Sequence, residues 1–223
     1  MITHALIFAA GRGERMRPLT DATPKPLLEV GGKLLIEWHL DRLAAFGVRN
    51  VVVNTSHLAG QFPEALGDGA QWRLHIAYSY EGSEALETGG GMLRALPLLG
   101  SAPFMAINGD VWSDFDFSAL PHQPAGLAHL VMVDNPPQHP LGDFALRDGR
   151  LFDEPLARLT FAGIGVYRPE LLAGHAPGKF SIAPLLRAAM RDGQVGGTHH
   201  RGRWSDVGTP QRLAELREHF GKP

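Results

Sequence analysis

The chain has 223 residues, 44% of them hydrophobic, so it can bury a core, and we expect a single domain over residues 1–223. Its formal net charge of −2 argues against a nucleic-acid partner, because nucleic-acid-binding faces carry a basic excess. It contains no cysteine, which excludes disulfides, thiolate metal sites and a cysteine nucleophile.

The chain begins with an apolar run over residues 2–10. This run lacks a basic flank and is too short for a signal peptide with its cleavage site. No later run approaches the roughly 18 apolar residues that a membrane span requires. We therefore expect a cytoplasmic protein without a membrane partner.

Strand-like and helix-like segments alternate through the first half, which is typical of a parallel sheet covered by helices. The expected strands are residues 6–10, 48–54, 74–80 and 103–108. The expected helices are residues 34–46, 58–66 and 90–96, ended by Gly47, Gly67 and Pro97. The pattern predicts a three-layer α/β unit.

The order changes after residue 110. Strands are expected at residues 128–133, 143–146, 149–152 and 159–167, with Asp148-Gly149 as a hairpin turn, and helices at 170–173, 182–190 and 211–219. We interpret Gly196-Gly197 as a turn and the histidines, including the loop pair His199-His200, as surface residues, since none has metal-ligand spacing. The predicted fold class is α/β: a Rossmann-like mixed sheet in three layers, with an inserted hairpin.

The first strand runs into a glycine-rich, cationic loop. Ala10, Gly11 and Gly13 bring backbone N–H groups to the strand end, where they can bind phosphate oxygens. Positive charge follows from Arg12, Arg15, Arg17 and Lys25. A dinucleotide fingerprint is excluded because Met16 stands where its last glycine belongs, and no Gly-Lys-Ser/Thr of a P-loop follows. The loop predicts a polyphosphate ligand.

In open parallel sheets, ligands bind beyond the carboxyl ends of the strands. That rule selects four segments of the chain: residues 11–25, Asn54, residues 81–91 and residues 108–110. We expect them to converge on one crevice.

Residues 11–20, Gly-x-Gly-x-Arg-Met-x-Pro-Leu-Thr, followed by Pro24-Lys25-Pro26-Leu27, resemble the signature of the sugar-1-phosphate nucleotidylyltransferases. The resemblance implies the nucleotide-diphospho-sugar transferase type of fold and transfer of a nucleotidyl group from an NTP to a sugar 1-phosphate. It also implies that Lys25 contacts the sugar phosphate or the reacting α-phosphate and that Arg15 faces the departing pyrophosphate.

Two aspartates far apart in the chain, Asp110 and Asp206, each follow or precede a predicted element. Each could simply cap a turn or a helix. Mg²⁺, however, is usually held by one or two carboxylates with phosphate oxygens and waters. In the resembling family, aspartates at these two positions bind the metal, which implies Mg²⁺ as cofactor.

The resemblance places the base-reading stretch at residues 81–91, with Glu81, Ser83, Thr88 and Gly89 beside Asn108 and Gly109. Many members carry a glutamine near Glu81 and a Gly-Thr-Ala sequence at residues 87–89, so the identity of the base stays open. Glu87-Thr88-Gly89-Gly90-Gly91 resembles the N-acetylmuramate-1-phosphate uridylyltransferases. This implies UTP and N-acetylmuramate 1-phosphate as substrates, in cell-wall sugar recycling.

For the sugar phosphate the resemblance points to Asn54, Gly142, Asp143 and Glu154. The family's lysine is absent from Asp153-Glu154-Pro155, which could equally be an exposed acidic turn. Residues 1–110 are expected to bind mainly the nucleotide, and residues 111–223 the sugar and the second side of the metal.

Several alternatives remain within this reading. Mannose 1-phosphate, glucose 1-phosphate or choline phosphate could be the acceptor, and a non-catalytic nucleotide-binding relative is a different class. A non-catalytic relative would be expected to have lost Asp110, Asp206 or Lys25, and all three residues are present. We expect a monomer or a small homo-oligomer.

Overall fold

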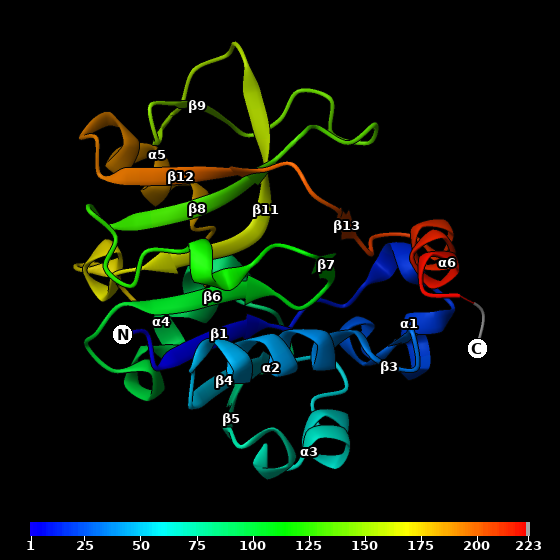
Figure 1. Cartoon of the computed structure of the whole chain (residues 1–223). Helices are drawn as coiled ribbons and strands as arrows, with labels where there is room; N and C mark the ends of the chain where they lie inside the picture. Colours follow the sequence, from blue (N-terminus) through cyan, green and yellow to red (C-terminus); the bar gives the residue numbers. More distant parts are fainter. Residues whose placement is uncertain (222–223) are drawn as a thin grey trace.

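The computed structural model describes residues 1–221, whose centre is a nine-stranded mixed sheet in the order β5-β4-β1-β6-β11-β8-β12-β10-β9 (Figure 1). Four neighbouring strands run parallel: β5 (His75–Tyr80), β4 (Asn50–Thr55), β1 (His4–Phe8) and β6 (Phe104–Asn108). Their carboxyl ends therefore meet at one edge of the sheet, as the sequence predicted.

The remaining strands continue the sheet in mixed directions. They are β11 (Arg158–Tyr167), β8 (Ala128–Val133), β12 (Val195–His200), β10 (Arg150–Phe152) and β9 (Phe144–Arg147). β11 is antiparallel to β6 and β8, while β12 is parallel to β8. The β9–β10 pair is the expected inserted hairpin, turning at residues 148–149.

Helices cover both faces of the sheet. One face carries α2 (Leu35–Phe46) and α3 (Gln61–Leu66), and the other carries α4 (Glu87–Leu99) and α5 (Ala183–Arg191). The alternation of side chains along β1 explains this: Ala5 and Ile7 belong to the first buried cluster and Leu6 to the second. The predicted three-layer α/β class is therefore confirmed.

A third buried cluster lies beside the sheet, where α6 (Pro210–His219) packs against the loop that follows β1. Its members include Met16, Val30, Trp112, Val207 and Leu213. Smaller elements complete this region: α1 (Leu19–Ala22), the hairpin β2 (Glu29–Val30) with β3 (Lys33–Leu34), and the pair β7 (Val111–Ser113) with β13 (Trp204–Asp206). Arg217 Nε on α6, the red helix in Figure 1, donates to the Glu29 carbonyl on β2 at 2.8 Å.

Three expectations were wrong. The residues expected as the Gly196-Gly197 turn and the His199-His200 loop form strand β12, which lies between β8 and β10. Helix α4 continues through Pro97 to Leu99, because a proline in the final turn removes few helical hydrogen bonds. The segment expected as a helix at residues 170–173 is a 3₁₀ turn, Pro169–Leu172.

The expectation that the histidines lie on the surface also fails at one position. His39 on α2 is 1% exposed. Helix α2 packs against β7. Among residues 1–221, no helix combines the length and apolarity needed to cross a bilayer.

Candidate active site

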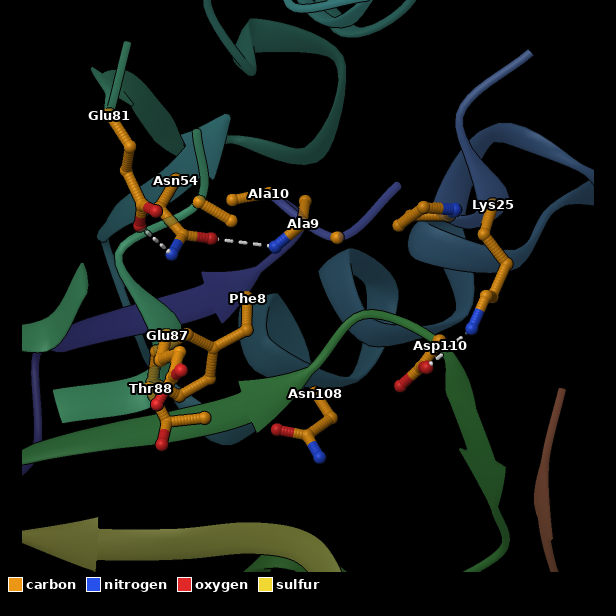
Figure 2. A pocket seen from close by; sticks show the side chains of 13 residues that line it. Phe8, Ala9, Ala10, Lys25, Asn54, Glu81, Glu87, Thr88, Asn108 and Asp110 are labelled. Carbon is orange, nitrogen blue, oxygen red and sulfur yellow. Dashed lines mark hydrogen bonds and ion pairs between the residues drawn. The ribbon is translucent and has the colours of Figure 1, made fainter. Parts of the chain in front are cut away.

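The four segments that follow β1, β4, β5 and β6 meet in one crevice, as expected. A cavity of about 240 Å³ lies there, lined by residues from Phe8 to Asp110. Figure 2 shows the polar side chains that reach it: Lys25, Asn54, Glu81, Glu87, Thr88, Asn108 and Asp110. The first half of the chain thus supplies the whole wall of this cavity.

Asn54 and Glu81 form a bridge across the floor of the crevice (Figure 2). The Ala9 backbone N–H donates to Asn54 Oδ1 at 2.6 Å, and Asn54 Nδ2 donates to Glu81 Oε1 at 2.5 Å. The Leu86 backbone N–H donates to Glu81 Oε2 at 2.6 Å. The bridge therefore joins Ala9, at the start of the glycine-rich loop after β1, to Leu86, directly before α4.

The bridge is closely packed. Glu81 is 7% exposed and Asn54 2% exposed. A Cβ added at Gly91 would lie 2.4 Å from Glu81 Oε1 and 2.7 Å from Asn54 Nδ2, so only glycine fits there. Burial raises the pKa of the Glu81 carboxyl, while the hydrogen bonds from Leu86 and Asn54 act in the opposite direction.

The backbone N–H groups of the glycines at the start of α4 are hydrogen-bonded within the protein. Phe180 C=O accepts from the N–H groups of Gly89 and Gly90 at 2.9 and 3.0 Å. Thr88 Oγ1 accepts from the Ile182 N–H at 3.0 Å. Residues 178–182 thus pack closely on the start of the helix at Gly89 and Gly90.

The glycine-rich loop after β1 is stabilised by its own contacts. Gly13 has φ +65°, a left-handed conformation that favours glycine, and Thr20 Oγ1 donates to its carbonyl at 2.8 Å. Arg12 donates to the Ser83 carbonyl at 3.2 Å, which links this loop to the loop after β5. Arg17 instead pairs with Asp21, at 3.1 Å.

A wider cleft of about 860 Å³ adjoins the crevice and shares Lys25, Ala85 and Glu87 with it. Its cationic side chains are Arg12, Arg15, Lys25 and Lys179, and its acidic ones are Glu14, Glu84 and Glu87. The expected cations Arg12, Arg15 and Lys25 therefore lie on one cleft, and this charge suits a polyanion.

Lys25 and Asp110 are paired at the junction of the two cavities. Lys25 Nζ lies 2.8 Å from Asp110 Oδ2, and the lysine side chain is 12% exposed (Figure 2). The neighbouring Gly109 N–H donates to the Phe8 carbonyl at 2.9 Å, which holds Asp110 next to the end of β1. Asp110 thus lies beside the phosphate loop.

Asp206 lies beside Asp110 in the fold. β13 pairs with β7 so that Asp206 is opposite Val111, and the Val207 N–H donates to the Asp110 carbonyl at 2.8 Å. Asp206 Oδ1 contacts Gln138 Nε2 at 2.8 Å and Arg212 Nη1 at 3.1 Å. The sequence allowed Asp206 to cap the following helix instead. In the structure Thr209 is the N-cap of α6, and its side chain accepts from the Arg212 N–H.

Asp110 and Asp206 are the candidate ligands for a magnesium ion. Among the described residues, hydrogen bonds reach Asp110 Oδ2 and Asp206 Oδ1, which leaves the other carboxylate oxygen of each free to bind a cation. Residues 1–221 hold no cluster of three or more His, Cys, Asp or Glu. A site of two carboxylates still suits Mg²⁺, because phosphate oxygens and waters complete its shell.

The residues expected at the sugar phosphate separate in the structure. Asp143 lines a branch of about 190 Å³ that shares Phe8, Thr88 and Asn108 with the crevice. Its Oδ2 accepts from the Phe161 N–H at 2.8 Å. Gly142 has φ +61° and packs on Asn135, whereas Glu154 pairs with Arg147 at 2.6 Å outside the lining of the branch.

Two cations of the site were not found from the sequence. Lys179 lies on the wide cleft and Arg187 on the branch, and both come from the segment around α5. Neither belongs to a motif or follows a predicted strand, so only their packing reveals them.

The chain is similar to known nucleotidyl transferases along its length. The family model described as nucleotidyl transferase matches residues 4–144. An N-acetylmuramate alpha-1-phosphate uridylyltransferase of Neisseria meningitidis is 50% identical over 95% of this chain and 95% of its own. An enzyme of the same name from Caulobacter vibrioides is 38% identical over 95% of this chain and 97% of its own.

The fold has a solved counterpart as well. A structure described as a glucose-1-phosphate thymidylyltransferase of Bacillus anthracis superposes with a TM-score of 0.85 at 18% identity, covering 99% of this chain and 96% of its own. This likeness concerns the fold, while the family model and the two relatives concern the sequence. The chain belongs to the nucleotidyl transferase family.

Proposed function

We propose that the protein transfers a uridylyl group from UTP to N-acetylmuramate 1-phosphate, giving a UDP-sugar and pyrophosphate. The observation that carries this proposal is the match, over 95% of the chain, to two relatives named for that reaction. The crevice supports it, because the glycine-rich loop after β1, Lys25 and Asp110 line it, and the pairing of β13 with β7 brings Asp206 next to Asp110.

In this proposal the nucleotide occupies the 240 Å³ crevice and its triphosphate extends into the wide cleft. Ala10, Gly11, Arg12 and Gly13 contact the phosphates, and residues 81–89 with Asn108 and Gly109 surround the base. Arg15 neutralises the departing pyrophosphate. Lys25 is placed between the cavities, where it can contact a phosphate oxygen of either substrate.

The reaction needs little proton chemistry from the protein. A phosphate monoester has a second pKa of about 6, so the attacking oxygen of the sugar phosphate is already anionic near neutral pH. It forms a bond to the α-phosphorus while the bond from that phosphorus to the pyrophosphate oxygen breaks. The protein aligns two polyanions and stabilises the charge that moves to the leaving group.

Asp110 and Asp206 would hold Mg²⁺. When bound, the ion supplies positive charge at the phosphates and orients them. Lys25 is paired with Asp110, and a bound cation together with phosphate oxygens would let this lysine exchange its carboxylate partner for a phosphate.

The acceptor and base can be tested together. Pyrophosphate release should be measured with each of four NTPs against N-acetylmuramate, N-acetylglucosamine, mannose and glucose 1-phosphates and choline phosphate, with and without EDTA. We expect the highest kcat/KM for UTP with N-acetylmuramate 1-phosphate and loss of activity with EDTA. A higher value with another pair would replace this assignment, and nucleotide binding without turnover of any pair would favour a regulatory protein.

A further inference from the structure

The proposed acceptor carries a chemical group that other sugar 1-phosphates lack. N-acetylmuramate is N-acetylglucosamine with a lactyl ether, which adds one methyl group and one carboxylate. An enzyme selective for it needs a cation for the carboxylate, because burying an unpaired charge is costly. The residues that the sequence assigned to the sugar do not include such a cation.

The branch of the crevice supplies both kinds of surface. Its wall is mainly apolar, with Phe144, Phe161 and Leu186 among its residues, and Arg187 is its one cationic lining residue within the described chain. The other ionised group on this wall, Asp143, is already held by the Phe161 N–H and by His139. A methyl group therefore meets apolar side chains there, and a carboxylate meets a guanidinium.

Arg187 shares its carboxylate partner with a second arginine. Its Nε lies 3.3 Å from Asp153 Oδ2, and Arg158 Nη2 lies 3.3 Å from Asp153 Oδ1. Two guanidinium groups thus share one carboxylate, which leaves the trio with one net positive charge. Arg187 is 41% exposed at its side chain, so it can reach a ligand without leaving α5.

We propose that Arg187 binds the lactyl carboxylate of the acceptor and determines selectivity for sugar 1-phosphates that bear an acidic ether. The inference rests on the proposed function and deepens it. The planar guanidinium offers several N–H donors, so it can keep Asp153 on one side and bind a second carboxylate on another. Asp153, expected as a sugar contact or an exposed turn, acts here by orienting Arg187.

The test compares three acceptors: N-acetylmuramate 1-phosphate, its lactyl carboxamide, and N-acetylglucosamine 1-phosphate. With the unaltered protein, we expect the carboxamide to lower kcat/KM by about tenfold or more, corresponding to about 1.4 kcal/mol. Arg187→Gln should lower kcat/KM by a similar factor, mainly through KM, and only for the acceptor that carries the carboxylate. The difference between the carboxylate and the carboxamide acceptors should then disappear. Arg187→Lys should retain part of that difference.

Arg191→Gln is the matched control, because Arg191 is an exposed arginine one turn further along the same helix. It should leave all three acceptors unchanged. Equal losses for every acceptor in Arg187→Gln would overturn the role of Arg187, and so would equal use of carboxylate and carboxamide by the unaltered protein. The second comparison needs no variant, so a folding defect cannot obscure it. Absence of turnover with every acceptor would refute the proposed function itself, and this role with it.

Discussion

Asn54 donates to Glu81 across 2.5 Å, and each of the two side chains also accepts from a backbone N–H, Ala9 for Asn54 and Leu86 for Glu81. Because both ends of this bridge are backbone N–H donors, one of its two side chains must accept hydrogen bonds only. Asn54 must accept from Ala9 and therefore donates to Glu81, so Glu81 must accept at both oxygens. An ionised carboxylate does this, and a glutamine amide does not.

Glu81→Gln should therefore weaken both folding and catalysis. The glutamine NH₂ would face either Asn54 Nδ2 or the Leu86 N–H, and a buried donor left without an acceptor costs about 1–3 kcal/mol. We expect a fall of that size in the free energy of unfolding, measured with urea, and a lower kcat/KM in pyrophosphate release.

The double variant Asn54→Asp/Glu81→Gln reverses the direction of the central bond and supplies acceptors for both backbone groups. It should recover most of the lost stability and activity. Wild-type behaviour of Glu81→Gln, or no recovery in the double variant, would contradict the role of bridge polarity.

Loss of either metal carboxylate should slow turnover strongly. Asp110→Asn and Asp206→Asn each remove one negative charge from the proposed ion, and we expect kcat to fall by about a hundredfold or more, the scale of a major electrostatic contact in catalysis. A magnesium titration of pyrophosphate release should reach half of its maximum only at a higher magnesium concentration in either variant. The control is Asp134→Asn, an exposed carboxylate paired with His199. Near-normal turnover in either variant would refute the metal assignment.

A substitution at Gly11 tests whether the triphosphate approaches this backbone, without disturbing the packing of the protein itself. Nothing lies within 4 Å of the position that a Cβ would take, so Gly11→Ala should leave the free energy of unfolding within about 0.5 kcal/mol. If triphosphate approaches this backbone, kcat/KM should fall by about tenfold or more, because small misplacements of reacting groups are costly.

Gly60→Ala is the control for Gly11, since Gly60 also has open space at its Cβ position and precedes α3, away from the crevice. Activity of Gly11→Ala equal to that of Gly60→Ala would mean that the phosphates bind elsewhere.

His39 should make stability depend on pH. Burial, with the nearby positive charge of Arg42 as the second cause, lowers the pKa of His39 from 6.5 to about 4. Between these values the unfolded chain binds a proton that the folded chain does not, so the free energy of unfolding falls as pH falls from 6.5 toward 4. From pH 7 to pH 5 the loss should be about 2 kcal/mol.

Urea unfolding at both pH values measures this effect. His39→Leu should reduce the loss between pH 7 and pH 5, whereas His75→Gln, at an exposed histidine on β5, should not change it. The same loss in His39→Leu would assign the pH dependence to other groups.

The strands that build the crevice could be predicted because their signals are local. Apolar runs ending in glycine or polar residues mark β1, β4, β5 and β6 to within a few residues, and the rule for parallel sheets then brings Gly11, Asn54, Glu81 and Asp110 together. Strand β12 was missed because Gly196 and Gly197 are typical of turns. In the sheet they allow close contact with His129 and Leu151, a requirement that only those neighbours impose.

The sequence by itself determined the phosphate loop and the choice of chemistry, since glycine spacing and cation density are properties of one short segment. Only the tertiary structure decided which partners these residues have. Asp206 lies beside Asp110 because burial of Trp112, Val207 and Leu213 drives the pairing of β13 with β7. Arg187 reaches the branch because α5 packs on that face. Such contacts join segments distant in the chain, and their energy comes from burial that no local pattern records.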